Sequence, residues 1–458
     1  MSTPKTHPAS RRNLTEGSIE RHLIRLTLPM TWGIFAIISF QLVDTFYISL
    51  LGTTELAALS LTFPITMAVF SLFIGFQIAM ASVGSRLIGG GDMETMRRVT
   101  THSVLLVFVL GMIIAALGLY FHDPIFRLVG ANDESLPLVW SYMSVWFAGA
   151  VFVTVPMIGN AAMRADGDSF TPAVVMTIVA FINIILDPIL IFGLFGFPRL
   201  ELQGAAMATI FANACAMVTG LYINYFRKNL LCSPFDLQLD KFKDSAKRLL
   251  FIALPAGLTN TIQPLVNAFI FSMLAVYGEE AIAAFGVATR IEAFCFVILM
   301  ALATGMAPII GQNWGAQKFD RVHHTLKVAI RFNFFWSLFV ALVLIVFGRQ
   351  IAGIFTDDPE IIKIMVLFFM MVPASYAFGN LIMGWGSAFN AMGKPARSVM
   401  MIVTRMVILL IPALYIGQHF FGIMGIFGAI AAVNVAAGIF FHLMNWRYCK
   451  RQEETIQQ

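Results

Sequence analysis

Two aspartates stand inside long apolar stretches of this sequence, where an ionised side chain is unfavourable. Asp44 lies in the first such stretch, and Asp187 lies in a later one, directly before Pro188. A carboxylate near the centre of a membrane span costs about 2.5–3.5 kcal/mol, so it usually faces protein or water or takes up a proton. Asn183 precedes Asp187 by four residues and therefore shares its helix face. These residues predict reversible binding of a proton or a small cation.

Each of these polar residues also has a structural explanation. Pro188 donates no backbone hydrogen bond, which frees a carbonyl one turn earlier, and Asp187 could merely satisfy that broken turn. Asp44 could lie at the outer membrane boundary. Asn160, in another apolar stretch, is more typical of contacts between helices than of ligand binding, and Tyr142 is typical of the aromatic belt at a membrane surface. The residue types alone leave both interpretations open.

The composition of the chain is that of a membrane protein. Of its 458 residues, 59% are hydrophobic and 12% are charged, and the mean hydropathy is +0.81. Soluble domains carry roughly 25% charged residues, so this chain has too little polar surface to coat a water-soluble globule. The formal net charge of +5 could suggest nucleic acid. However, the basic residues form short clusters beside apolar runs, as residues that flank spans do, and we expect no nucleic-acid partner.

Apolar runs long enough to cross a bilayer, about 20 residues each, predict an all-α polytopic membrane protein with twelve transmembrane helices. The first run follows a polar N-tail and is too long for the core of a cleaved signal peptide, so we expect it to be retained. The predicted spans are 24–50, 56–84, 99–121, 137–163, 170–197, 203–226, 246–276, 281–311, 326–347, 361–391, 396–418 and 425–446.

The distribution of Lys and Arg predicts the side of the membrane on which each terminus lies. With the N-terminus inside, 24 of the 30 basic residues fall on the inner side and four fall in outer loops, while Arg290 and Arg405 fall within spans. This asymmetry follows the positive-inside rule. We expect both termini in the cytoplasm, and the expected location is a bacterial inner membrane.

The two halves of the chain resemble each other at a spacing of 226 residues. Leu28-Pro29 recurs as Leu254-Pro255 at this spacing. Six spans per repeat give both halves the same direction across the membrane, which predicts two pseudo-symmetric six-helix bundles with a cavity between them. The predicted parts are a cytoplasmic N-tail at 1–22, an N-lobe at 23–226, a cytoplasmic linker at 227–245, a C-lobe at 246–446 and a cytoplasmic C-tail at 447–458.

The acids of the first half are missing from the corresponding positions of the second. Asp44 corresponds to Ile270, and Asp187 corresponds approximately to Ala413. If the acids served packing alone, both halves should keep them. We therefore expect the first lobe to bind the coupling cation and the second mainly to shape a cavity.

Two charged residues of the eighth span, Arg290 and Glu292, are two positions apart and so lie on different helix faces. We expect them to flank the membrane interface or to pair with a neighbour such as Arg405.

The sequence motifs do not support an enzyme. No HExxH, GxSxG or P-loop pattern occurs, and the eight histidines are not grouped at ligand spacing. The four cysteines form no CxxC pair, so neither a disulfide framework nor a metal site of zinc type is indicated. We expect no catalytic residues and no cofactor, and the sequence has no nucleotide domain to drive an ATP-dependent pump.

Several segments together resemble the multidrug and toxic compound extrusion (MATE) family, most closely its DinF-like bacterial branch. The similarity extends over about residues 15 to 447. The segments that carry it are the Pro-bent first span with Asp44, the run Met163-Arg164-Ala165-Asp166-Gly167-Asp168 after Asn160, the Asn183–Asp187–Pro188 span, and the runs from Gly286 to Glu292 and from Pro308 to Gly315.

The resemblance implies a fold of the same two-lobe kind and a particular site. Members of the family carry a polar network in the N-lobe that couples cation entry to the export of amphipathic, often cationic, drugs. Pro29 and Pro188 are the expected conformational hinges. On this sequence the resemblance assigns the network to Asp44, Tyr142, Asn160, Asn183, Asp187 and Thr209.

The second lobe departs from the pattern of NorM-like members, in which C-lobe acids serve a sodium site. The corresponding position of the seventh helix is Gln263, and the acid of the tenth helix is replaced near Gly379 or Asn380. This departure favours protons as the coupling ion, while sodium at Asp44 and Asp187 stays an alternative.

The predicted function is secondary active multidrug efflux, in which protons are exchanged for amphipathic organic compounds by alternating access. Burial and like charge both favour the protonated form of Asp44 and Asp187. Protonation from outside would release the drug, and loss of the proton inside would free the acids for the next molecule. A flippase for a lipid-linked sugar or another lipid is the alternative, and it would need a basic cavity. The expected partners are drugs, protons and the lipid bilayer, and we expect a monomer.

Overall fold

The computed structural model describes residues 13–233 and 238–457, and within them the regular structure is helical. The first half holds α1 (Ile19–Ser49), α2 (Thr53–Gly89), α3 (Met93–Tyr120), α4 (His122–Val129), α5 (Leu136–Ala148), α6 (Ala150–Ala165), α7 (Phe170–Phe192), η1 (Leu194–Gly196), α8 (Glu201–Tyr222) and η2 (Ile223–Arg227). The second half holds α9 (Leu239–Leu274), η3 (Ala275–Tyr277), α10 (Glu279–Gly315), α11 (Phe319–Phe355), α12 (Pro359–Met371), η4 (Pro373–Ser375), α13 (Tyr376–Ala391), α14 (Pro395–Val403), η5 (Thr404–Leu410) and α15 (Ile411–Gln457).

The helices provide twelve spans, which confirms the predicted all-α architecture. Ten helical segments of the described chain are long and apolar enough to cross a membrane, and α5 with α6, which meet at a 47° bend, form an eleventh span. The twelfth comes from the 56-residue segment Pro395–Lys450, which is more than twice as long as a bilayer requires. This segment reverses its direction around Gly422, where φ is 59° and ψ is −139°. A Cβ on Gly417 would lie 2.2 Å from the carbonyl oxygen of Gly425, an approach that a straight helix does not allow between residues eight apart.

Two spans are interrupted, and several helices continue beyond the predicted spans. The fourth span bends between α5 and α6, at Gly149, and the tenth passes from α12 to α13 through η4, where Pro373 cannot donate a backbone hydrogen bond. Helix α9 begins at Leu239, within the expected linker 227–245. Most of the expected N-tail, residues 1–12, lies outside the described residues.

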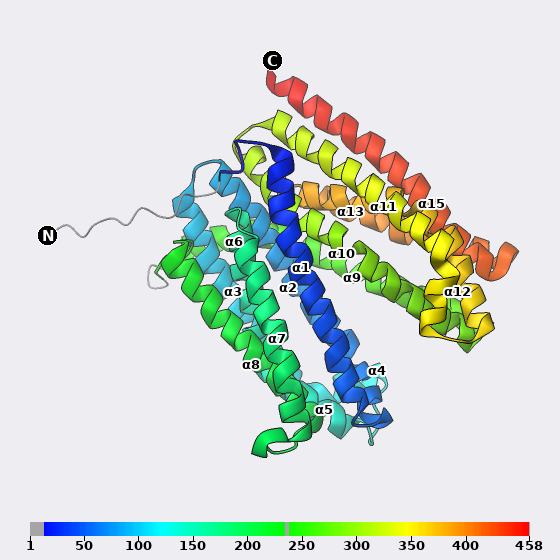
Figure 1. Cartoon of the computed structure of the whole chain (residues 1–458). Coiled ribbons are helices and arrows are strands. Elements are labelled where there is room, and N and C mark those ends of the chain that lie inside the picture. Colours follow the sequence, from blue (N-terminus) through cyan, green and yellow to red (C-terminus); the bar gives the residue numbers. More distant parts are fainter. Residues whose placement is uncertain (1–12, 234–237, 458) are drawn as a thin grey trace.

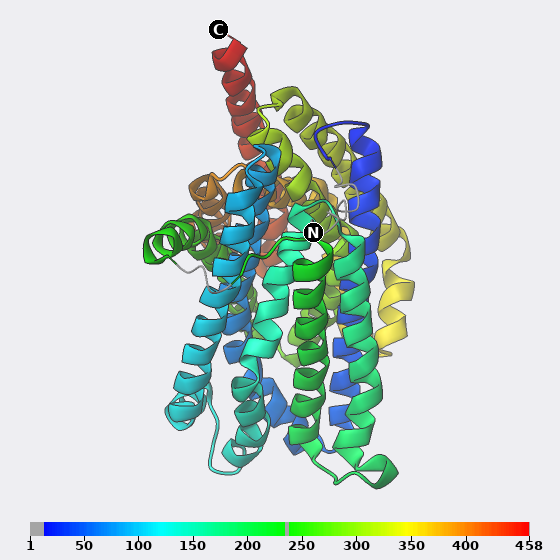
Figure 2. The same cartoon turned by 90° about the vertical axis from the view of Figure 1, so that its left-hand side faces the viewer.

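The spans form two bundles that lie close together at one end. We call α1 to η2 the N-lobe and α9 to α15 the C-lobe. In Figure 1 the start of α1 and the C-terminal part of α15 lie at the same end, which we call the termini end, and the lobes diverge toward the opposite, far end. Helix α2 packs on α9 and α10, and α1 packs on α10. One close approach between the lobes needs a glycine, because a Cβ on Gly75 of α2 would lie 2.2 Å from the carbonyl oxygen of Ala253. Figure 2 shows the N-lobe helices running between the two ends.

The termini end is closed by polar contacts between the lobes and the segment before α1. The side chain of Gln312 on α10 is 1% exposed. It accepts a hydrogen bond from the Leu14 backbone N–H at 3.2 Å and donates one to the Ala165 carbonyl at 2.7 Å. The neighbouring Asn313 donates to the Leu14 carbonyl at 3.1 Å. These contacts, which we call the seal, join the N-lobe, the C-lobe and the entry of α1.

Further contacts extend the seal on both sides. Arg321 on α11 donates to the carbonyl oxygens of Leu14 and Gly17 at 3.2 and 2.9 Å, and Ser82 on α2 donates to the Asn390 carbonyl on α13. Helix α1 begins with Ser18 as its N-cap, which accepts a hydrogen bond from the Arg21 backbone N–H. The segment before α1 is therefore held by the C-lobe on one side and continues into the N-lobe on the other.

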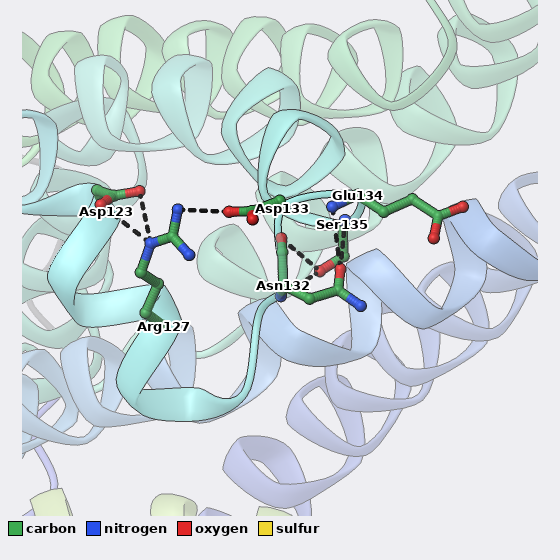
Figure 3. Close-up of polar contacts among 6 residues, drawn as sticks. All are labelled: Asp123, Arg127, Asn132, Asp133, Glu134 and Ser135. Atoms are coloured by element: carbon green, nitrogen blue, oxygen red, sulfur yellow. Dashed lines mark hydrogen bonds and ion pairs between the residues drawn. The ribbon is translucent and has the colours of Figure 1, made fainter.

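At the far end, a basic side chain of α4 is paired with acids of α4 and of the loop between α4 and α5. Arg127 lies 3.1 Å from Asp123 and 2.7 Å from Asp133, as Figure 3 shows. The hydrogen bonds that Arg127 donates to these two carboxylates raise the pKa of Arg127. Asn132 accepts hydrogen bonds from the backbone N–H groups of Glu134 and Ser135 and thereby shapes the turn into α5. Of the four basic residues in predicted outer loops, Arg199 and Lys363 are likewise paired, with Glu201 and Glu360.

Candidate functional site

Three of the expected site residues lie at one level of the N-lobe, near its far end. Helices α1 and α7 both run from the termini end to the far end (Figure 1). Asp44 precedes the last residue of α1 by five positions, and Asp187 precedes the last residue of α7 by five, so each lies about 7.5 Å below its helix end. Tyr142 is six positions into α5, which starts at the far end, and so lies about 9 Å deep. Helices α1 and α7 pack along each other, and Tyr142 at a similar depth interacts with both aspartates.

The three side chains interact within the protein interior. The Asp44 and Asp187 carboxyl groups are close enough for electrostatic repulsion, and the Tyr142 phenol senses both of them. Asp187 is 0% exposed and Tyr142 is 9% exposed, while Asp44 is partly buried. Both carboxylate oxygens of Asp187 and one of Asp44 are buried without a hydrogen-bond partner among the described residues. Buried carboxylates without donors are unfavourable when charged, so the pair is suited to take up a proton or a cation.

The depth and burial of Asp44 and Asp187 can be compared with the structural explanations that the sequence left open for them. We expected Asp44 deep in the first span, and the structure instead places it in the last two turns of α1. This depth agrees with a position of Asp44 at the outer membrane boundary. The contacts of the side chain do not agree with it, because the carboxyl group faces Tyr142 and Asp187 inside the lobe. The alternative explanation of Asp187, pairing with the carbonyl freed by Pro188, is not seen, because neither carboxylate oxygen has a partner.

The remaining expected site residues are less closely joined to the acids. Asn183 is 0% exposed on the buried face of α7, and its amide donates to the Val179 carbonyl of its own helix at 2.9 Å. Asn160 on α6 and Thr209 on α8 are partly buried. Within the described part of the chain, no hydrogen bond joins either side chain to Asp44 or Asp187. Their place in a coupling network stays a prediction.

The two prolines expected as hinges lie inside helices that the structure shows as uninterrupted. Pro29 lies in α1 and Pro188 lies in α7, and both helices continue across them. Helices α1 and α7 pack along each other, and Gly33 permits the contact, because a Cβ there would lie 3.1 Å from the Ala173 Cα. The hinge role of the prolines stays a prediction.

The site offers oxygen atoms but few charged ligands. No group of three or more His, Cys, Asp or Glu side chains that could hold a metal ion occurs in residues 13–233 and 238–457. Asp44 and Asp187 supply two carboxylates, and the side-chain oxygen of the adjacent Asn183 is also buried without a partner. Hard cations prefer such oxygen ligands, so the set can accept a proton or a single sodium ion.

The C-lobe contains a second charged group that the sequence indicated only in part. Glu292 on α10 interacts with Arg405 and with Tyr376. Arg405 donates to Asn434 at 2.6 Å, and Asn434 donates to Ser375 at 2.9 Å. The expected pairing of Glu292 with Arg405 agrees with this arrangement. Sequence reasoning missed Tyr376, Asn434 and Ser375, whose only signal is a polar side chain inside an apolar span.

Twelve spans in two lobes, closed at one end and carrying in the N-lobe a pair of buried carboxylates without hydrogen-bond partners in the described part of the chain, define a membrane transporter. The MatE family model matches residues 29–189 and again residues 255–416, with starting points 226 residues apart. The chain therefore belongs to the MatE family, whose members are transporters and not enzymes. Its narrower assignment to the DinF-like branch stays a prediction.

Three similar proteins extend this result over nearly the whole chain. A FAD transporter of Shewanella oneidensis is 36% identical over 446 residues, which cover 97% of this chain and 98% of that protein. The multidrug export protein MepA of Staphylococcus aureus is 28% identical over 443 residues, covering 95% and 96%. The crystal structure of the Vibrio cholerae MATE transporter VcmN in the bent form is 29% identical, covers 97% of this chain and 99% of that one, and has a TM-score of 0.90.

Proposed function

We propose that this protein exports amphipathic organic molecules from a bacterial cytoplasm in exchange for protons, with Asp44 and Asp187 as the coupling groups. The buried, unpartnered carboxylate pair carries the proposal. The termini end is assigned to the cytoplasm, because 24 of the 30 basic residues fall on that side. The described conformation then has its seal inside and its lobes apart outside.

The coupling step follows from the electrostatics of the pair. Two carboxyl groups that repel each other within the protein interior cannot both be ionised without a large penalty, so a proton from the outside is taken up readily. Protonation removes the repulsion and lets α1 and α7 pack more closely. Release of the proton on the inside restores the charge and the affinity for a positively charged part of the cargo. Proton and cargo thus alternate on one set of side chains.

The energy available to this cycle is sufficient for concentrative export. Each elementary charge that crosses a potential of 100 mV supplies about 2.3 kcal/mol. Because 1.4 kcal/mol corresponds to a factor of ten, one proton supports roughly a 40-fold gradient of a neutral cargo. Sodium at the same two carboxylates is the alternative coupling ion.

The proposed cargo class follows from the relatives. One similar protein is named a multidrug export protein and another a FAD transporter. We therefore propose amphipathic cargo in the range from drug-sized cations to dinucleotides. A lipid flippase is the alternative, and the two relatives are named for other cargo.

The test is ethidium efflux from proteoliposomes driven by a pH gradient. Asp187→Asn and Asp44→Asn should each abolish the gradient-dependent part of the efflux. Asp133→Asn is the matched control, because Asp133 lies at the same end of the lobe but is 90% exposed and belongs to the α4–α5 loop. Full gradient-driven efflux by both Asp44→Asn and Asp187→Asn would refute the proposal.

A further inference from the structure

We propose that Arg290 and the polar side chains beside it form an anion subsite on the C-lobe wall of the space between the lobes, which binds a phosphate or carboxylate group of the cargo. The inference rests on the proposed export of amphipathic molecules and adds an anionic group as a second feature of the cargo that the protein can recognise.

The contacts between α1 and α10 show where Arg290 points. Near the termini end the two helices touch, because a Cβ on Gly305 would lie 3.0 Å from the Thr27 hydroxyl oxygen. Further toward the far end Phe294 of α10 meets Phe35 of α1 edge to face, with ring centroids 6.4 Å apart. Both rings are already well exposed, at 39% and 44%.

Arg290 is the next position of the same α10 face, one turn beyond Phe294 toward the far end. Its side chain is exposed, and Figure 1 shows α1 and α10 diverging in that direction. The face of α10 that carries Arg290 is therefore packed on the N-lobe at the termini end and opens onto the space between the lobes at Arg290.

The depth of Arg290 makes a lipid-facing position unfavourable. It lies eleven positions from the start of α10, which corresponds to about 16 Å along the helix and so to the middle of a bilayer. A guanidinium group at this depth has to face protein or water. No ion pair or hydrogen bond of Arg290 occurs within the described residues, and the acid two positions away, Glu292, is engaged with Arg405 and Tyr376. Arg290 therefore has its charge available for a ligand.

Two polar side chains of α9 lie at or within one turn of the depth of Arg290. Phe271 of α9 lies against Gly286 of α10, where a Cβ would be 3.8 Å from its ring. Because the two helices are antiparallel, one turn deeper on each brings Asn267 level with Arg290. Asn267 accepts a hydrogen bond from Gln263 at 3.0 Å, and Gln263 is exposed. The amide groups of Asn267 and Gln263 supply further donors around the guanidinium.

This combination of groups recognises an anion attached to an aromatic body. A guanidinium group binds phosphate or carboxylate through two parallel hydrogen bonds. Phe294 and Phe35, one turn deeper, provide ring faces for an apolar or aromatic part. Asp44 and Asp187 belong to the opposite lobe, so the anion subsite and the proton site are on different walls and can be occupied together.

The test compares two fluorescent probes that share one ring system, riboflavin and riboflavin 5′-phosphate. Their binding to the purified full-length chain in detergent is measured by fluorescence titration. The wild type should bind the phosphate ester more tightly than riboflavin. Arg290→Gln should weaken binding of the ester about tenfold, as expected for loss of a charge-assisted contact, and should leave riboflavin binding unchanged. Arg290→Lys should keep part of the preference for the phosphate ester, because lysine retains the positive charge but cannot donate two parallel hydrogen bonds.

A charge control and a lipid control complete the experiment. Lys363→Gln removes another basic charge, one that is 73% exposed and paired with Glu360, and should leave the preference intact. The inference would be overturned if Arg290→Gln kept the full preference for the phosphate ester, or if it lost affinity for both probes equally. In nanodiscs, displacement of riboflavin 5′-phosphate from the wild type by added phosphatidylglycerol would identify a lipid headgroup as the phosphate source and overturn a soluble cargo. Since binding needs no gradient, the result is independent of proton coupling.

Discussion

Loss of the Gln312 side chain should release the seal at the termini end. Gln312→Ala removes the hydrogen bonds to the Leu14 N–H and the Ala165 carbonyl, and both backbone groups remain buried in the closed state. A hydrogen bond contributes about 1 kcal/mol net, and an unsatisfied buried partner adds to the loss. The closed state should lose about 2–3 kcal/mol relative to the open one, which is roughly a 30- to 150-fold shift in their ratio.

The assay measures how often the seal opens. Ala391 is 1% exposed at the end of α13, and its carbonyl lies 3.4 Å from the Ser82 hydroxyl. In a chain whose four native cysteines are replaced by alanine, Ala391→Cys should react slowly with a water-soluble maleimide. Adding Gln312→Ala should raise the reaction rate at least tenfold, because the rate follows the open population when opening is fast.

The matched control is a buried amide that does not bridge the lobes. Asn333 is 7% exposed and donates to the Ala377 carbonyl at 3.2 Å within the C-lobe. Asn333→Ala should lower the melting temperature without changing the reactivity of Ala391→Cys. An unchanged rate in Gln312→Ala, or an equal rise in Asn333→Ala, would show that the Gln312 hydrogen bonds do not hold the termini end closed.

Two further predictions concern charged groups away from the proposed coupling pair. Glu292→Ala leaves Arg405 inside the C-lobe without its acid, and removal of one member of a buried pair typically costs about 3–5 kcal/mol. The melting temperature of Glu292→Ala in detergent should therefore fall well below that of Arg290→Ala. Equal melting temperatures would contradict the pairing of Glu292 with Arg405. Hydrogen bonds from the α1 N-terminal backbone, from Ser18 and from His324 lower the pKa of Glu20 to about 2. The stabilisation is present above the unfolded value of about 4.3 and is lost as the pH falls toward 2. The melting temperatures of wild type and Glu20→Gln should therefore differ at pH 6, still differ at pH 4 and converge only as the pH approaches 2; a constant difference would contradict the pKa shift.

The sequence predicts the span architecture well because the bilayer imposes it. The hydrocarbon thickness sets a length for each apolar run, and the broken spans still occupy the predicted ranges 137–163 and 361–391 as helix pairs. Helical periodicity likewise predicts the shared face of Asn183 and Asp187. The reversal at Gly422 agrees with the predicted gap between the last two spans.

The contacts between distant segments could not be predicted in this way. Gln312 and Asn313 look in the sequence like the ordinary polar end of a span, yet they bind Leu14, which is about 300 residues away. Helix periodicity states which residues share a face, but it does not state which faces meet. For the same reason, only the family resemblance placed Asp44 and Tyr142 in one network. Their similar depth in the lobe becomes clear from the ends of α1 and α5 in the structure.

Proton movement triggered by cargo is the most direct test of the account. Wild-type protein and Asp187→Asn are reconstituted with a pH-sensitive dye inside the vesicles, with and without sodium, and ethidium is then added. The account predicts a pH change in wild type that does not require sodium and that Asp187→Asn lacks. A pH change of wild-type size in Asp187→Asn, or one that occurs only with sodium, would contradict proton coupling at the buried carboxylate pair.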